Sequence, residues 1–286
     1  MINSIEGTDS PSDKFTPSSF NEAIQYPHWK SAIEAEYNAL TKNNTWKLAE
    51  LPKGRKTVKC KWVFKVKENA DGTIAKYKAR LVACGYTQIE GIDYSNTFAP
   101  VIKLSTIRAL LALAAKQGYN ITQADVVTAF LHAFMEEEVY MDQPQGFEKK
   151  GENGESLVCL LLRSIYGLKQ AGRNWNKFLD TWFKKNKFKV GGADPCLYIY
   201  KDENGNFIFI GIHVDDFLIF DNNPALRQKF IEDMSKSFSL DFLGDAKWVL
   251  QVKITRAENS ITIDQSKIIF PTGLVKQSAI MSLVGI

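Results

Sequence analysis

The spacing of apolar residues predicts a mixture of helices and strands along the chain. Helical spacing covers residues 28–42, 104–117, 173–188 and 225–238. Strand patterns cover residues 59–67, 196–200, 207–212 and 217–220. Residues 68–83 add a turn at Asp71-Gly72 and a second strand, and a strand from Ile121 runs into a turn or helix. Because no regular βαβ alternation appears, the pattern predicts an α+β fold with a mainly antiparallel sheet.

Details of the termini and helix ends add to this picture. Residues 1–19 are polar and rich in Ser, Pro and Asp, which predicts a disordered lead-in. Ser105 or Thr106 is the candidate N-cap of the 104–117 helix. The first residues lack a signal-peptide layout, and no apolar run approaches the ~20 residues that span a bilayer. We therefore expect a cytoplasmic protein with no membrane partner.

The composition excludes a wholly disordered chain and a fibrous protein. The 286 residues are 45% hydrophobic and 24% charged, which is ordinary globular usage. The four cysteines and three histidines show no metal-ligand spacing, so we expect reduced thiols and no histidine-rich metal site.

Charge is concentrated in two basic blocks. Residues 42–83 hold twelve Lys or Arg against three acids, and residues 163–189 hold eight against one. Aromatic residues that could stack on bases lie among them, at Trp46, Trp62, Phe64, Tyr77, Tyr166, Trp175 and Trp182. This combination favours a surface for a polyanion such as nucleic acid. A solvated lysine-rich face is the alternative.

Two neighbouring carboxylates interrupt the most apolar part of the chain. In FIFIGIHVDDFLIF, residues 207–220, two strand patterns flank Asp215 and Asp216 at the predicted turn. Adjacent like charges between core strands resist ionisation, and a divalent cation would relieve the conflict. An acidic turn screened by water is the alternative.

Holding two metal ions for phosphoryl or nucleotidyl transfer needs a third carboxylate. Asp125 is the best candidate because it ends an apolar strand pattern. A helix N-cap role for Asp125 is the alternative. Asp142, Asp194 and Asp221 also remain candidates.

A series of sequence blocks resembles the reverse transcriptase domain of copia-type LTR retrotransposon Pol polyproteins. In order, the blocks read HWKSAIEAEYNAL, NNTWKLAELPKG, CKWVFKVKENADGTIAKYKARLVACGYTQIEGIDYSNTFAPV, LSTIRALLALAA, QADVVTAFLHAFMEEEVYMDQPQGF, LLRSIYGLKQAGRNWNKF, DPCLYIY and HVDDFLIF. The resemblance covers residues 20–268 and leaves 269–286 as a divergent tail. It implies a right-hand polymerase fold with fingers at about 45–100, a palm at about 101–255 and the start of a thumb.

The resemblance also implies catalytic roles. Asp125, Asp215 and Asp216 match the family's catalytic aspartates, and the Val126 carbonyl matches a further metal ligand. They would bind two Mg²⁺ ions, with Mn²⁺ as an alternative, for transfer of a dNTP to a primer 3′-hydroxyl.

Five further positions match the family's nucleotide-binding residues. Phe130 matches an aromatic that excludes a ribose 2′-hydroxyl, with core packing as the alternative. Lys78 and Arg80 match the basic pair near the triphosphate, with plain surface charge as the alternative. Tyr166 and Gly167 match the segment under the incoming nucleotide, although Gly167 could equally serve a turn.

Several positions depart from the family pattern. His213 stands for Tyr, Ala133-Phe134 for Gly-Asp, Gly172 for Pro, Cys84 for Lys, and Gln251 for Gly. An Ala at 133 would be strained if the position needed a positive φ.

The sequence therefore leaves three functional hypotheses. The first is an RNA-directed DNA polymerase domain, acting on an RNA or DNA template with primer and located in a virus-like particle if it belongs to an intact element. The second is an inactive relic that at most binds nucleic acid. The third, a generic two-metal nuclease or phosphotransferase, does not account for the basic hairpin. No oligomeric state is predicted.

Overall fold

The computed structural model describes residues 14–69, 71–250, 252–257, 260–264 and 281–284. The chain divides into two units, each made of two segments: Met1–Phe98 with Phe130–Asn174, and Ala99–Ala129 with Trp175–Ile286. The chain therefore passes from the first unit into the second, returns to the first at Phe130 and enters the second again at Trp175. The family resemblance, by contrast, implies a single boundary between fingers and palm, near residue 100. That assignment stays a prediction.

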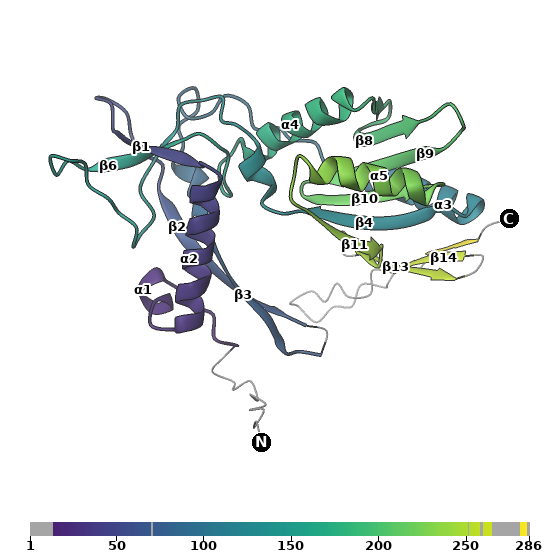
Figure 1. Ribbon diagram of the computed structural model, residues 1–286, viewed down its shortest axis with the longest axis horizontal. Coiled ribbons are helices and arrows are strands. Elements are labelled where there is room, and N and C mark those ends of the chain that lie inside the picture. The colour runs from purple at the N-terminus through teal and green to yellow at the C-terminus, as the bar shows by residue number, and fades with distance from the viewer. Residues whose placement is uncertain (1–13, 70, 251, 258–259, 265–280, 285–286) are drawn as a thin grey trace, which may run out of the picture. The chain divides into compact units, whose positions relative to one another are not determined.

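The first unit is built on a basic hairpin covered by a helix (Figure 1). Its elements are α1 (Phe20–Ala23), α2 (Pro27–Lys42), β1 (Trp46–Glu50), β2 (Cys60–Glu68), β3 (Ile74–Ala83), η2 (Gly85–Thr87), β5 (Tyr140–Met141) and β6 (Leu157–Leu161). Trp29 of α2 is fully buried and meets Phe64 and Tyr77 edge-on, with ring centroids 5.4 and 5.0 Å away. Because α2 covers only one face of the hairpin, the lysine side chains lie on the other face.

Antiparallel pairing dominates both units, as predicted. In the first unit β2 pairs with β3, and β1, β6 and β5 form a sheet in that order. Local sequence does not predict the strands β1, β5 and β6, because these short stretches lack a clear alternation of apolar and polar residues.

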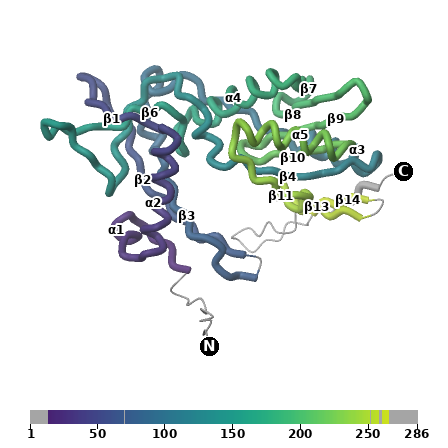
Figure 2. The backbone as a smooth tube through the Cα atoms, in the orientation of Figure 1, coloured from purple at the N-terminus to yellow at the C-terminus, as the bar shows by residue number. Residues whose placement is uncertain are grey.

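The second unit contains a six-stranded antiparallel sheet with the order β11-β4-β10-β9-β8-β7 (Figure 2). Its elements are α3 (Leu104–Gln117), β4 (Asn120–Val126), β7 (Lys189–Gly191), β8 (Asp194–Lys201), β9 (Phe207–His213), β10 (Asp216–Asp221), α5 (Pro224–Ser235), β11 (Leu240–Asp245), β12 (Trp248–Val249), β13 (Val252–Ala257), β14 (Ser260–Asp264) and β15 (Met281–Val284). Two elements cross the division between the units, η3 (Ala129–His132) and α4 (Ala171–Lys185).

The central strand β10 is covered on both faces. Phe217 faces Phe183 of α4, with ring centroids 6.2 Å apart, and α5 lies beside the same strands. Leu218 and Phe220 point the other way, into a core shared with α3 and the β13–β14 hairpin. Burial on both faces explains why FLIF is a continuous apolar run rather than an alternating one.

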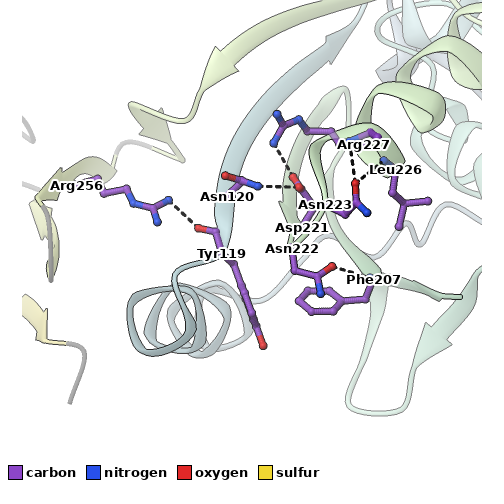
Figure 3. Close-up of polar contacts among 10 residues, drawn as sticks. Tyr119, Asn120, Phe207, Asp221, Asn222, Asn223, Leu226, Arg227 and Arg256 are labelled. Carbon is purple, nitrogen blue, oxygen red and sulfur yellow. Dashed lines mark hydrogen bonds and ion pairs between the residues drawn. The ribbon is translucent and has the colours of Figure 1, made fainter. Parts of the chain in front are cut away.

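A buried ion pair fixes the end of β10 to α5 (Figure 3). The Asp221 carboxylate is fully buried and accepts from Arg227 Nη1 at 2.8 Å and from Asn120 Nδ2 at 2.9 Å. The side chain of Asn223 caps α5 by accepting from the backbone N–H of Ala225. These contacts join β10, its neighbour β4 and the start of α5.

The structure corrects one predicted N-cap and one predicted helix end. The N-cap of α3 is Lys103, and neither Ser105 nor Thr106 caps it. Instead, buried Asp194 of β8 accepts from the Lys103 backbone N–H at 2.9 Å and from Thr106 Oγ1 at 2.6 Å. A carboxylate distant in sequence thus replaces the local cap. The helix predicted over 173–188 ends at Lys185, because Lys187 adopts a left-handed φ of 66°.

The predicted terminal segments fall mostly outside the described residues. The lead-in 1–19 is described only from Lys14 on, where Ser18 and Ser19 form a capping arrangement with Glu22 at the start of α1. The divergent tail 269–286 is described only as the strand β15.

Candidate active site

The predicted catalytic aspartates lie on neighbouring strands of the second unit. Asp125 of β4 and Asp216 of β10 are direct cross-strand partners, so their side chains point to the same face of the sheet. Asp215 precedes β10, and its carbonyl accepts from the Val126 backbone N–H at 2.9 Å. The structure thus brings together residues that are about 90 positions apart in sequence.

Asp125 lies inside a strand, so the alternative that it caps a helix is wrong. Its other antiparallel neighbour, β11, places Asp241 directly opposite it. Sequence reasoning missed Asp241, because only the pairing of β11 with β4 brings the two carboxylates to one face.

Two of the alternative carboxylates are committed to structural contacts. Asp221 is held by Arg227 and Asn120, and Asp194 by the start of α3 and the Cys196 backbone N–H. These hydrogen bonds hold the pKa of Asp194 below its usual value even though burial opposes this. The third alternative, Asp142, belongs to the first unit. Asp125 is the candidate that lies beside Asp216.

The turn that presents the aspartate pair has an unusual backbone. His213 pairs with Asp216, which leaves Val214 and Asp215 as the two central residues. Val214 has a φ of 58°, a left-handed conformation that glycine adopts freely and β-branched residues avoid. With a positive φ at the first central residue, the turn resembles type II′.

The environment of Asp216 disfavours its charged form. Burial and, second, the charge of Asp215 raise the pKa of the Asp216 carboxyl above its ordinary 3.8. A hydrogen bond of 3.4 Å from Gln123 Nε2 and the nearby His213 act in the opposite direction. The like-charge conflict expected from the sequence is therefore present at Asp216.

The donor chemistry of this group fits a divalent cation, since hard cations such as Mg²⁺ prefer carboxylate oxygens. Within the residues that the structure describes, no group of three or more His, Cys, Asp or Glu side chains converges on one point where an ion could sit. Binding of a metal ion would therefore require the aspartate side chains, which already lie on the same face of the sheet, to rotate toward one another.

Three of the predicted nucleotide-binding residues stack together in the first unit. The Arg80 guanidinium lies over the Tyr166 ring, 4.6 Å from its centroid. Phe130 meets the same ring edge-on at 4.7 Å. Phe130 is half-buried and also packs against the hydrophobic core of the first unit, so the alternative of core packing stays open.

Gly167 is required by the backbone around it. Its φ is 90°, and a Cβ there would lie 2.0 Å from the Ala83 carbonyl oxygen. The preceding Tyr166 carbonyl accepts from the Ala83 backbone N–H at 2.8 Å. The close approach at Gly167 is thus made by the end of β3.

Lysines gather on the outer face of the β2–β3 hairpin. Lys65 faces Lys78 across the strands, and Lys67 faces Lys76. Like charges directly opposite destabilise a sheet, so this face is suited to an anionic partner. Arg80 lies on the same face, opposite exposed Val63.

The departures from the family pattern are accommodated locally. Ala133 is buried without a positive φ, so the expected strain is absent. Phe134 is exposed, and the Arg163 guanidinium lies over its ring, 3.9 Å from the ring centroid. Cys84 is buried at the end of β3, and Gly172 lies in the first turn of α4. Gln251 lies outside the described residues.

Comparison with known proteins identifies the family of the chain. Residues 43–281 match the family described as reverse transcriptase (RNA-dependent DNA polymerase). The chain therefore belongs to the reverse transcriptase family. The expected kinship with copia-type retrotransposon Pol polyproteins is likewise confirmed by its relatives.

Three plant relatives carry the name Retrovirus-related Pol polyprotein. The one from transposon TNT 1-94 of Nicotiana tabacum is 43% identical over 252 residues, or 87% of this chain. Those from transposons RE1 and RE2 of Arabidopsis thaliana are 35% and 37% identical over 87% and 86% of it. The match spans 19%, 17% and 17% of these relatives, so the chain corresponds to one part of much longer polyproteins.

In the described part of the chain, no helix is both long and apolar enough to cross a membrane.

Proposed function

We propose that this chain is an RNA-directed DNA polymerase domain with a right-hand arrangement of fingers and palm. The observation that carries the proposal is the register that sets Asp125 opposite Asp216, with Asp215 in the adjoining turn. A generic nuclease would need the same carboxylates but gives no reason for the paired lysines of the β2–β3 hairpin.

Each group of residues has a distinct task in this proposal. Asp125, Asp215, Asp216 and the Val126 carbonyl hold the metal ions. When bound, two Mg²⁺ ions lower the pKa of the primer 3′-hydroxyl and neutralise the triphosphate. Lys78 and Arg80 bind the triphosphate of the dNTP.

The aromatic residues position the nucleotide. Arg80, held over the Tyr166 ring, keeps its fork of N–H donors in a defined plane, which suits bidentate contact with phosphate. Phe130, at the edge of the same ring, would contact the sugar and exclude a 2′-hydroxyl. Gly167 fixes the segment that carries Tyr166 against β3.

The proposal is tested by primer extension on an oligo-dT-primed poly(A) template, with and without Mg²⁺. We expect metal-dependent extension that Asp215→Asn abolishes while primer-template binding changes little. Asp245→Asn, at an exposed position of β11, is the control for the loss of one negative charge and should retain extension. Loss of binding together with extension in Asp215→Asn would contradict the metal-binding role.

An inactive relic that binds nucleic acid is the second candidate. The departures from the family pattern, such as His213 for Tyr, favour it, and the lysine pairs of the hairpin would serve either candidate. The same assay separates the two. Folded protein that binds the template with a steep salt dependence but extends no primer, with Mg²⁺ or Mn²⁺, would favour the second candidate.

A further inference from the structure

The turn before Asp216 is held by a side chain from a helix that lies far from it in sequence. The indole Nε1–H of Trp175, in α4, donates to the Val214 carbonyl oxygen at 2.7 Å. The Trp175 side chain is 1% exposed and meets Phe238 edge-on, with ring centroids 5.7 Å apart. The donor is therefore fixed in place by packing.

The residue that accepts this hydrogen bond is the one with the unfavourable backbone. A φ of 58° at a β-branched residue persists only where surrounding contacts enforce it. Two contacts hold successive carbonyls of the turn: Trp175 holds that of Val214, and the Val126 backbone N–H holds that of Asp215. Together they fix both central residues of the turn.

We propose that Trp175 is a positioning residue whose indole N–H holds the strained Val214–Asp215 turn, and thereby sets the orientation of Asp215 and Asp216. The inference rests on the proposed function for its consequence in catalysis. The hold itself is a property of the folded protein and can be measured without any activity.

The chain offers a matched control on the same helix. Trp182 Nε1 also donates a hydrogen bond, at 3.1 Å to the Ser237 hydroxyl, but that contact does not involve the aspartate turn. Trp175→Phe and Trp182→Phe therefore make the same chemical change at two places. Val214→Gly is the complementary variant, because glycine adopts the positive φ without support.

Amide hydrogen exchange over residues 210–219 is the first measurement. Trp175→Phe should accelerate exchange there about tenfold, the effect of losing one well-formed hydrogen bond. Trp182→Phe should leave these amides unchanged. Val214→Gly added to Trp175→Phe should slow exchange again, because glycine removes the backbone strain that favours opening of the turn once the indole donor is lost. Equal exchange in the two Phe variants, or no rescue by Val214→Gly, would overturn the proposal.

Kinetics then tests the consequence. Trp175→Phe should lower kcat for extension by about tenfold or more, since small displacements of reacting groups are costly, while primer-template affinity stays the same. The double variant with Val214→Gly should recover most of kcat. A wild-type protein that extends no primer would overturn the proposed function, and exchange would still decide whether Trp175 holds the turn.

A variant that fails to fold does not remove the test. Val214→Gly alone should melt at or above the wild-type temperature, because it removes backbone strain. A clearly lower melting temperature would contradict a strained turn and with it the need for Trp175 to hold one.

Discussion

The two ends of β10 carry aspartates in opposite circumstances. Asp221, at the far end, is fully buried beside Arg227 and Asn120. Asp216, at the near end, is half-buried, lies beside Asp215 and faces Asp125 across the sheet. Both residues have β4 as their neighbour, so the contrast arises from the partners rather than from the strand.

This contrast distinguishes a structural carboxylate from a candidate functional one. At Asp221 the charge is matched by a cation of the protein, which ties α5 to the sheet. At Asp216 burial and the like charge of Asp215 raise the pKa, because both make ionisation of the carboxyl unfavourable. Such an arrangement destabilises the fold unless a ligand supplies the positive charge.

The largest expected effect is on catalysis, from the same substitution at the two ends. Asp216→Asn should lower extension by about a hundredfold or more, the loss expected when several kcal/mol of metal-assisted stabilisation is removed. Asp221→Asn should keep the activity of each folded molecule when assayed below its melting temperature. Equal losses at the two ends, measured by primer extension, would break the distinction.

The next effect is on stability and concerns the far end. Arg227→Met should lower the free energy of unfolding by about 3 kcal/mol, because Asp221 would remain buried without its cation. Urea unfolding measures this change. The double variant Asp221→Asn with Arg227→Met should recover much of the loss, since the amide introduced at position 221 can still accept from Asn120. An unchanged unfolding midpoint in Arg227→Met would show that the pair is not structural.

The smallest effect is a pH dependence at the near end. Because the folded pKa of Asp216 is raised, this group destabilises the fold as pH rises above the ordinary value of 3.8. Without metal, Asp216→Asn should therefore melt slightly higher than wild type at neutral pH, and the difference should vanish once the pH falls below that ordinary value. Added Mg²⁺ should raise the melting temperature of wild type more than that of the variant. A difference independent of pH would contradict the charge conflict.

Much of the fold follows from local sequence patterns. The helix predicted at 104–117 has the same bounds as α3, because a long apolar run marks it clearly. The β2–β3 hairpin and β8 to β10 follow from apolar runs separated by turn residues. The cap of α3 could not be predicted, since Asp194 is brought to it only by tertiary packing.

The sequence predicts which aspartates form the candidate site, but not which residues hold them in place. Asp215 and Asp216 stand out because charges interrupt an apolar run, and the family resemblance adds Asp125. Nothing in the spacing indicates that Val214, rather than Asp216, is a central residue of the turn, or that Trp175 contacts it. Such details depend on strand register and helix packing, which local sequence does not encode.

The position of β4 in the sheet has a consequence for synthesis of the chain. This partly buried strand lies between β10 and β11, which both follow it at a long distance in the sequence. At ~5–20 residues per second, the ribosome delivers those neighbours on the order of 5–20 s later. During that interval β4, which is an inner strand of the finished sheet, has two unpaired edges. The nascent chain must avoid mispairing at these edges, unaided or with a chaperone, until both neighbours are synthesised.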